Sequence, residues 1–273
     1  MAKKRADILM VEQGLTDSRQ KAQAMIMAGQ VYFGERRCDK AGLTLEEGTP
    51  LEIRGRTMPY VSRGGLKLEK AMAVFPVALT GKTAADIGAS TGGFTDCMLK
   101  NGAAKVYAVD VGYGQLAWSI RNDPRVVCLE RTNARYLTSE QIPEELDFAS
   151  IDVSFISLGL ILPALRPLMR ADAEVVALVK PQFEAGREKV GKKGVVRDAA
   201  VHLEVLEQFL RHGEQADFSV KGLDFAPIRG PEGNIEYLGY LCAGAGESFG
   251  GDLKELVRRS HEMLKGEGHE SRA

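Results

Sequence analysis

The stretch from Ala84 to Phe94 constrains the fold of this chain more than any other part of the sequence. A short apolar run over residues 83–87 ends in a turn that carries three glycines, and residues 93–101 have the spacing of a helix. A strand that leads into such a turn and then into a helix N-terminus forms a ligand crevice at the carboxyl edge of an α/β sheet. Glycines allow the sharp turn and let a ligand approach the backbone. The stretch therefore predicts a cofactor site on an open sheet.

The spacing within this turn argues against a dinucleotide. In the Gly-x-Gly-x-x-Gly pattern that binds a pyrophosphate, the three glycine positions are here Gly88, Ser90 and Gly93. The serine stands where the backbone must come close to the pyrophosphate. The next apolar run, residues 105–109, ends at Asp110, where a carboxylate commonly binds ribose hydroxyls. A nucleoside cofactor without phosphates fits both observations, and S-adenosylmethionine is the obvious candidate.

Apolar runs and helical patterns alternate regularly after the turn. Such alternation predicts a mainly parallel sheet that is covered by helices on both faces. The last two strands have no helix between them, so we expect them to pair in antiparallel fashion. Strands are expected near residues 83–87, 105–109, 125–129, 147–151, 174–179, 217–226 and 235–241, and helices near residues 64–75, 93–101, 114–120, 156–169, 198–212 and 251–265.

A small module precedes this sheet. Two helical patterns, at residues 6–15 and 18–28, are followed by strand patterns at 30–35 and 51–53. A short segment punctuated by glycine and proline then reads as a linker. The predicted domain boundaries are 1–53 for the module, 54–60 for the linker, 61–243 for the sheet domain, and 244–273 for a helix and polar tail without an assigned role.

Basic residues are concentrated in and just after the module. Residues 1–67 carry 12 Lys and Arg against 8 Asp and Glu, a net charge of +4, whereas the rest of the chain sums to −5. This asymmetry favours a polyanion as the partner of the module. A solvated charged face is the alternative interpretation.

The order of short motifs in the module resembles the S4-type RNA-binding domain of ribosomal proteins and RNA-modifying enzymes. The matching segments are Arg5-Ala6-Asp7, Ser18-Arg19-x-x-Ala22, Gly29-x-Val31 and Gly48-Thr49, with a departure at Phe33-Gly34, where an asparagine–glycine turn is usual. The resemblance implies RNA binding, through phosphates rather than bases. The candidate RNA-binding residues of the module are Arg5, Arg19, Lys21, Arg36 and Arg37.

Polar residues follow two neighbouring strands of the predicted sheet. Asp152 comes directly after the strand at 147–151, and Lys180 directly after the strand at 174–179. Because the carboxyl ends of such strands face the crevice, we expect both side chains at one site. Glu236 lies inside a run that otherwise reads as sheet, and a charge buried there needs a partner.

Together with Lys67, these residues form an ordered set that resembles the Lys-Asp-Lys-Glu tetrad of RNA ribose 2′-O-methyltransferases of the FtsJ type. The TlyA family, named for haemolysis but regarded as rRNA 2′-O-methyltransferases, is the closer match. The resemblance covers nearly all of residues 3–243. It implies a Rossmann-like, mostly parallel methyltransferase sheet with its last strand antiparallel, preceded by the small α+β S4-type domain. Its segments are Ser62-Arg63-Gly64-Gly65-x-Lys67-Leu68, residues 86–96, residues 109–112, residues 152–157, residues 180–184 and residues 231–237.

The resemblance implies methyl transfer from S-adenosylmethionine to a ribose 2′-hydroxyl of 16S or 23S ribosomal RNA, at a cytidine. Lys67, Asp152, Lys180 and Glu236 are the catalytic candidates, with Lys180 nearest to the nucleophile as a base or as an orienting cation. Further RNA contacts are expected at Arg63, Lys189, Lys192 and Lys193, and the segment 187–197 is either a mobile lip or a surface loop. The implied cofactor-binding residues are Asp86, Gly88, Ser90, Gly92, Gly93, Phe94, Asp110, Asn133 and Phe155.

Three other functions fit parts of the sequence. The family name invites a membrane-active haemolysin, but no apolar run approaches the roughly 18 residues of a membrane helix. A ribosome-binding protein without catalysis is the second alternative, and the intact tetrad argues against it. A methyltransferase of bases or proteins is the third. Base-nitrogen enzymes often end a strand in Asn/Asp-Pro-Pro-aromatic, which Asp152-Val153-Ser154-Phe155 does not match.

The remaining patterns concern metals and location. The four cysteines are scattered and show no zinc spacing, so no metal is expected. The start Met-Ala-Lys-Lys-Arg is followed by no apolar core of a signal peptide. We therefore expect a cytoplasmic protein, and a monomer is favoured.

Overall fold

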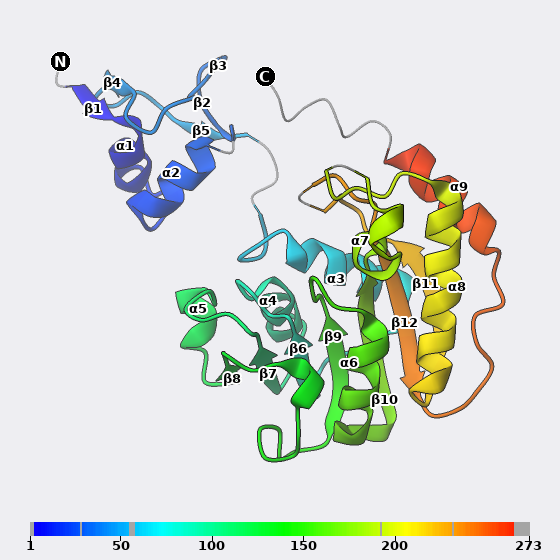
Figure 1. Ribbon diagram of the computed structural model, residues 1–273. Coiled ribbons are helices and arrows are strands. Elements are labelled where there is room, and N and C mark those ends of the chain that lie inside the picture. The colour runs from blue at the N-terminus through cyan, green and yellow to red at the C-terminus, as the bar shows by residue number, and fades with distance from the viewer. Residues whose placement is uncertain (1–2, 28, 55–57, 192, 231, 265–273) are drawn as a thin grey trace. The chain divides into compact units, whose positions relative to one another are not determined.

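The computed structural model describes residues 3–27, 29–54, 58–191, 193–230 and 232–264 (Figure 1). The chain divides into two compact units, Met1–Pro59 and Tyr60–Ala273. The first unit has one small hydrophobic core, and the second has two larger ones on the two faces of its sheet.

The N-terminal unit combines two helices with short strands. Helices α1 (Ala6–Glu12) and α2 (Arg19–Met27) pack against each other, as their apolar spacing predicts. The strands are β1 (Lys3–Arg5), β2 (Val31–Phe33), β3 (Arg36–Arg37), β4 (Thr44–Glu46) and β5 (Glu52–Ile53). They form an antiparallel pair, β1–β4, and a three-stranded sheet, β3–β2–β5. The sequence does not predict β1, β3 or β4, because two or three residues are too few to show an alternation.

A buried carboxylate organises basic residues of this unit. Asp7 is 0% exposed and accepts hydrogen bonds from Arg5 at 2.9 Å, Arg19 at 3.2 Å and Gln23 at 2.8 Å. The hydrogen bond from Arg5 holds the pKa of Asp7 well below its ordinary value, and those from Gln23 and Arg19 act in the same direction. Asp7 therefore stabilises the unit only in its ionised form.

We predict that the N-terminal unit loses stability as the pH falls below about 4, the ordinary pKa of an aspartate. Because the pKa of Asp7 is depressed in the fold, its stabilisation is complete above that value and is lost as the pH falls through the lower folded one. Asp7→Asn should cost about 1.5–3 kcal/mol at pH 7, as expected for a hydrogen bond to a charged group. Hydrogen exchange of residues 3–54 in the full chain, corrected for intrinsic rates, measures this. If the stability of the N-terminal unit depends on pH in Asp7→Asn as it does in the wild type, the prediction is wrong.

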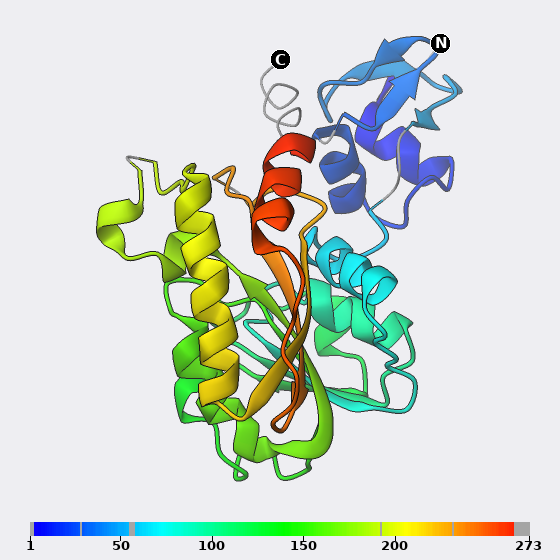
Figure 2. The same ribbon diagram turned by 90° about the vertical axis from the view of Figure 1, so that its right-hand side faces the viewer.

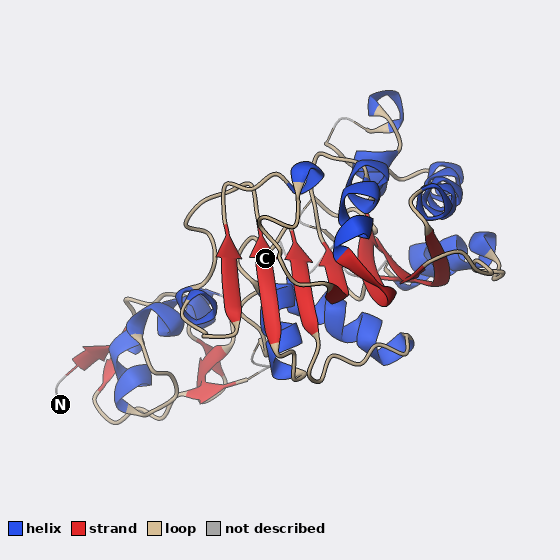
Figure 3. Cartoon of the chain, turned by 90° about the horizontal axis from the view of Figure 1, so that it is seen from below, coloured by secondary structure: helices blue, strands red, loops and turns tan. Residues whose placement is uncertain are grey.

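The second unit is built on a seven-stranded sheet. Its strands are β6 (Thr83–Ile87), β7 (Lys105–Val109), β8 (Val126–Leu129), β9 (Leu146–Ile151), β10 (Met169–Val179), β11 (Phe218–Phe225) and β12 (Tyr237–Ala243). Their order is β11–β12–β10–β9–β6–β7–β8, as the labels of Figure 1 allow the reader to follow, and Figure 3 shows strands of this sheet side by side. The five strands from β10 to β8 are parallel, and β12 is antiparallel to both of its neighbours. The predicted mostly parallel sheet with an antiparallel last strand is confirmed.

Helices connect the strands of this sheet. They are α3 (Gly64–Val74), α4 (Gly93–Lys100), α5 (Trp118–Arg121), α6 (Leu158–Leu165), α7 (Pro181–Glu184), α8 (Ala199–Gln215) and α9 (Leu253–Met263). The helix expected over residues 114–120 is only the single turn α5, because the backbone of Ala117 is extended, with a ψ of 140°. The helix expected over residues 156–169 ends at Leu165, and after one 3-10 turn β10 begins five residues earlier than expected.

Alternate residues of β6 enter the two halves of the core. Ala85 and Ile87 of β6 belong to the cluster that includes α6, α8 and α9, whereas Ala84 packs with α3 and α4 on the opposite face. This two-residue period is typical of a strand that is buried on both faces. Helices α8 and α9 lie side by side on one face (Figure 2). The sheet is therefore covered on both sides, and its edge is left for the site.

Candidate active site

The glycine turn joins β6 to α4 and packs against the end of β9. Gly88 follows β6 with a φ of +88°, and a Cβ atom on it would lie 2.4 Å from the carbonyl oxygen of Asp152. Gly92 precedes α4 with a φ of +91°. Only a residue without a side chain lets the turn and the end of β9 come this close.

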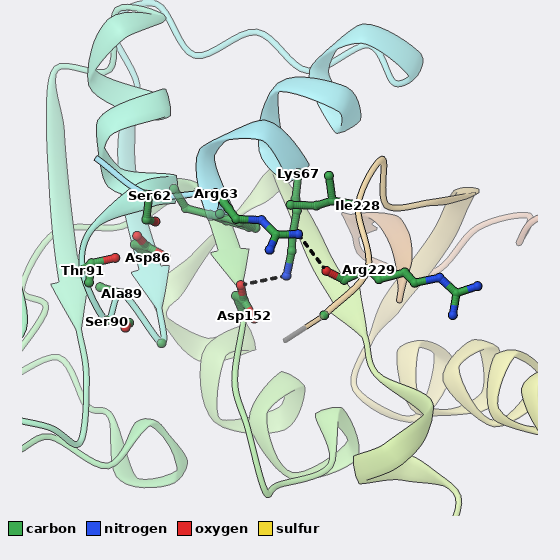
Figure 4. Close-up of a pocket in the computed structure, with 15 residues that line it drawn as sticks. Ser62, Arg63, Lys67, Asp86, Ala89, Ser90, Thr91, Asp152, Ile228 and Arg229 are labelled. Carbon is green, nitrogen blue, oxygen red and sulfur yellow. Dashed lines mark hydrogen bonds and ion pairs between the residues drawn. The ribbon is translucent and has the colours of Figure 1, made fainter. Parts of the chain in front are cut away.

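A cavity of about 480 Å³ lies at this turn (Figure 4). Its wall comes from the start of α3, the glycine turn, the end of β9 and the loop after β11. The volume lies within the roughly 300–1,000 Å³ that is typical of small-molecule sites. Five residues predicted to bind the cofactor line the cavity, namely Asp86, Gly88, Ser90, Gly93 and Phe94.

Asp86 is the buried carboxylate of this cavity. It is 0% exposed and accepts hydrogen bonds from the backbone N–H of Thr95 at 2.9 Å, from the hydroxyl of Thr95 at 2.6 Å and from the hydroxyl of Ser150 at 3.2 Å. Burial raises the pKa of Asp86 to about 6, and the nearby carboxylate of Asp152 acts in the same direction. A cation bound beside Asp86 would lower its pKa again, so this part of the cavity favours a positively charged ligand.

We predict that the wild type loses stability relative to Asp86→Asn as the pH rises from about 4 to about 6. The pKa of Asp86 is raised in the fold, so its stabilisation is complete below the unfolded pKa and is lost as the pH rises through about 6. At 1.36 kcal/mol for each pH unit, the change amounts to roughly 3 kcal/mol at most. Urea unfolding of both proteins at pH 4, 5, 6 and 7.5, without ligand, measures it. If the free energies of unfolding of the two proteins differ by the same amount at all four pH values, the prediction is wrong.

Four ionisable side chains form a continuous row of ion pairs beside the cavity. Lys67 Nζ lies 2.6 Å from Glu236 Oε2 and 3.7 Å from Asp152 Oδ2. Lys180 Nζ lies 2.5 Å from Asp152 Oδ1. The order in space is Glu236–Lys67–Asp152–Lys180, and we call this row the tetrad. The structure thus brings together all four residues that the sequence analysis takes as catalytic.

The sheet topology explains why these four residues meet. Asp152 follows β9 and Lys180 follows β10, which are parallel neighbours, so both residues lie at the same edge. Glu236 precedes β12, and because β12 runs antiparallel to β10, its start lies at that edge too. Lys67 reaches the same place from the first turn of α3. The charge of Glu236, which the sequence analysis expects to need a partner, is paired with Lys67.

A second cavity, of about 700 Å³, also borders on the tetrad. Lys67 and Asp152 line the first cavity, whereas Lys180 and Glu236 line the second. Phe155 also lines the second cavity; it is 91% exposed, has a φ of +64°, and its ring centroid lies 4.9 Å from that of Phe183. An exposed aromatic side chain in a strained backbone conformation at the mouth of a cavity is a candidate for a ligand contact.

Four of the predicted cofactor residues lie outside the first cavity. Asp110 accepts hydrogen bonds from the backbone N–H groups of Ser90 and Gly112 at 2.8 and 2.7 Å, and thereby holds the glycine turn. Gly92 faces Leu116 and Ile120. Asn133 accepts a hydrogen bond from the backbone N–H of Arg135 at 3.1 Å. Phe155 belongs to the second cavity.

Most of the predicted RNA-binding residues are paired with acidic groups. Besides the pairs of Arg5 and Arg19 with Asp7, the pairs are Lys21–Asp17, Arg37–Asp39 and Lys189–Glu204. Arg36 and Lys193 are exposed, and Lys192 lies outside the described residues. Arg63 lines the first cavity and donates a hydrogen bond to the carbonyl of Arg229 at 3.2 Å. The described members of this set, Arg63 included, are exposed surface groups, so each needs its own test for a contact with RNA.

The segment 187–197 is anchored where it approaches β12. Asn234, which is 2% exposed, donates a hydrogen bond to the carbonyl of Gly194 at 2.9 Å and accepts one from the backbone N–H of Val196 at 3.0 Å. Val195 and Val196 are buried. Val195 and Val196 therefore belong to the packed interior, whereas Lys193, Gly194 and Arg197 on either side of them are exposed.

The sequence analysis does not predict several groups that line or hold the first cavity. Ser62 lies within a quoted motif, but its contact with the cavity is not predicted. The loop residues Ile228, Arg229 and Gly230 show no periodic or charge signal of their own. Thr95 stands nine residues after Asp86, and only the structure shows that its hydroxyl bonds that carboxylate.

The chain belongs to the FtsJ-like methyltransferase family: the model of this family matches residues 60–243, and the model of the S4 domain matches residues 4–51. A relative from Bacillus subtilis named "Putative rRNA methyltransferase YqxC" is 53% identical over 270 residues, which cover 96% of each chain. The "16S/23S rRNA (cytidine-2'-O)-methyltransferase TlyA" of Mycobacterium tuberculosis is 45% identical over 238 residues, covering 87% of this chain and 89% of the relative. The solved structure "Putative hemolysin from Streptococcus thermophilus" has a TM-score of 0.77 and 49% identity, and covers 97% of this chain and 98% of its own.

Within the described ranges, no group of three or more His, Cys, Asp and Glu side chains is arranged to hold a metal ion. None of the helices among the described residues has the length and apolarity needed to cross a membrane.

Proposed function

We propose that the protein methylates a ribose 2′-hydroxyl of ribosomal RNA, with S-adenosylmethionine as the methyl donor. The observation that carries this proposal is the tetrad of Lys67, Asp152, Lys180 and Glu236 at the border of two cavities, one of which contains the glycine turn. Two cavities that meet at one row of charges suit a reaction between two substrates. The names of the relatives from Mycobacterium tuberculosis and Campylobacter jejuni point to a cytidine of 16S or 23S rRNA as the acceptor.

The first cavity fits the cofactor in size and chemistry. The carboxylate of Asp86 lies where a cationic group is favoured, and S-adenosylmethionine carries both an ammonium and a sulfonium. Bound there, the cofactor supplies an activated methyl group. Asp86, Gly88 and Gly93 line the cofactor site, whereas Gly92 and Asp110 hold the turn that forms it.

The second cavity is the site that we assign to the acceptor nucleotide. Lys180 lines it and is paired with Asp152, so its ammonium is fixed at the border with the first cavity. In that position Lys180 donates a hydrogen bond to the 2′-oxygen, orients it toward the first cavity and stabilises the negative charge that develops while the 2′-oxygen takes the methyl group and its proton passes to water. Lys67 holds Asp152 and Glu236 in place. Alignment of the two reactants supplies the largest share of the rate, since it is worth roughly 7–11 kcal/mol in favourable cases.

We predict that Lys180→Ala lowers turnover by about 10²–10⁴-fold, the usual contribution of a positioned proton-transfer or hydrogen-bonding group. Binding of S-adenosylmethionine, measured by calorimetry, should survive because Lys180 does not line the first cavity. The assay uses radiolabelled cofactor and ribosomal subunits that lack the modification, followed by mapping of the labelled nucleotide.

Lys70→Ala is the matched control for this experiment. Lys70 lies on α3, one turn after Lys67, and pairs with Asp224 at 3.0 Å outside both cavities. Its removal should leave turnover unchanged. Full turnover by Lys180→Ala, or no labelling of any subunit by the wild type, is incompatible with the proposed function.

The S4 domain is the part of the chain that we assign to RNA affinity. Arg36 and Arg37 lie together on β3, exposed and beside a concave surface lined by Tyr32, Phe33 and Lys40. We predict that replacing both arginines by alanine weakens RNA binding at all sequences and lowers the slope of log K against log salt by about 1 for each lost phosphate contact. Filter binding between 50 and 200 mM salt measures the slope. If the slope of the double variant equals that of the wild type, Arg36 and Arg37 do not contact phosphates of the RNA.

All four residues of the tetrad come from one chain, so the proposed site is complete without a second copy. We therefore propose that a monomer is the active form. We also propose that the protein acts in the cytoplasm, where ribosomal RNA is available.

A further inference from the structure

Arg229 connects the wall of the first cavity to helix α9. Its guanidinium donates two hydrogen bonds, from Nε at 3.0 Å and Nη2 at 2.7 Å, to the carbonyl oxygen of Leu264. A third, from Nη1, reaches the carbonyl of Gly233 at 2.8 Å. Figure 4 shows the side chain of Arg229 directed away from the cavity, while its own carbonyl accepts the hydrogen bond from Arg63.

The carbonyl of Leu264 is a favourable partner for this guanidinium. Leu264 directly follows α9, and the last carbonyls of a helix have no partner within the helix. They also carry the negative end of the helix dipole, which attracts a cation. Leu264 itself is 3% exposed and belongs to the larger core. The clasp between Arg229 and Leu264 therefore joins the loop after β11 to the buried end of α9.

A second contact fastens α9 to the strand that begins beside the tetrad. The hydroxyl of Tyr237, the first residue of β12, lies 3.0 Å from Ser260 Oγ on α9 and 2.8 Å from His202 Nδ1 on α8. All three side chains are fully buried. Burial lowers the pKa of His202 to about 4, so the ring is neutral at physiological pH. Tyr237 directly follows Glu236, so α9 also holds the backbone next to the tetrad.

The loop that Arg229 holds is in direct contact with Glu236. A Cβ atom on Gly230 would lie 2.5 Å from Glu236 Oε1, and Gly230 lines the first cavity with Ile228 and Arg229. A displacement of this loop would change both the cofactor cavity and the carboxylate that pairs with Lys67. Misplacement by about 1 Å in an aligned site is enough to cost on the order of 10²-fold in rate.

We propose that Arg229 is a positioning residue through which helix α9 sets the cofactor cavity and the place of Glu236. This inference rests on the proposed function, and it gives a role to part of the segment 244–273. Helix α9 then serves the reaction without contacting either substrate.

The test compares Arg229→Ala with Arg258→Ala, a control on the exposed face of α9, where Arg258 pairs with Glu255 and Glu262. We expect Arg229→Ala to raise KM for S-adenosylmethionine and to lower kcat by about 10–100-fold at 25 °C, as for other losses of alignment. Millimolar guanidinium should restore part of the activity. Arg258→Ala should match the wild type.

The outcomes separate this inference from the proposed function. An inactive wild type rejects the proposed function, and calorimetry with S-adenosylmethionine then still shows whether Arg229→Ala weakens binding. If the wild type is active and Arg229→Ala lowers only the melting temperature, the clasp is structural and the inference is wrong. If Arg229→Ala does not fold, Arg229→Lys is used in its place. A lysine keeps the positive charge but cannot donate the two parallel hydrogen bonds to the carbonyl of Leu264. If Arg229→Lys has the kcat and KM of the wild type, the inference is wrong.

Discussion

The carboxylate of Asp152, held between two lysines, is the interaction on which the site depends. One oxygen is paired with Lys180 and the other with Lys67, which in turn is paired with Glu236. The backbone of Asp152 also fixes the glycine turn, since its carbonyl leaves no room for a side chain on Gly88. One residue therefore joins the row of charges to the cofactor cavity. A buried row of this kind is stable only while each charge keeps its partner, because removal of one partner leaves an uncompensated charge.

Much of this arrangement is predictable from the sequence, for a physical reason. Apolar runs that end in Asp152 and Lys180 predict strand ends, and parallel strands bring their carboxyl ends to one edge. The partner of Glu236 is harder to predict, because it depends on the antiparallel insertion of β12 between β10 and β11. The contacts of the loop that contains Arg229 are still harder to predict from the sequence. Its contact with Arg63 spans 166 residues of sequence, and its contact with Leu264 is made to a backbone carbonyl. Backbone acceptors leave no trace in the amino-acid pattern.

The two cavities divide residues whose positions in the sequence predict a single site. Phe155 was expected beside the cofactor, but its ring lies with Phe183 in the second cavity. Gly92 and Asp110 support the glycine turn and do not line the first cavity. Spacing along the chain identifies the residues near a strand end, but it does not tell which side of the tetrad each side chain faces. That depends on backbone conformations such as the φ of +64° at Phe155.

The buried Asp7 has a consequence for the way in which the N-terminal unit meets a polyanion. Its hydrogen bonds fix Arg5 and Arg19 before any partner arrives, and two guanidinium groups on one carboxylate leave a net positive charge. Ordering a long side chain at an interface normally costs about 0.5–1.5 kcal/mol in rotamer entropy. Here folding has already imposed that order. The pair is thus pre-organised, because the directions of its remaining donors are set by a carboxylate of the protein interior.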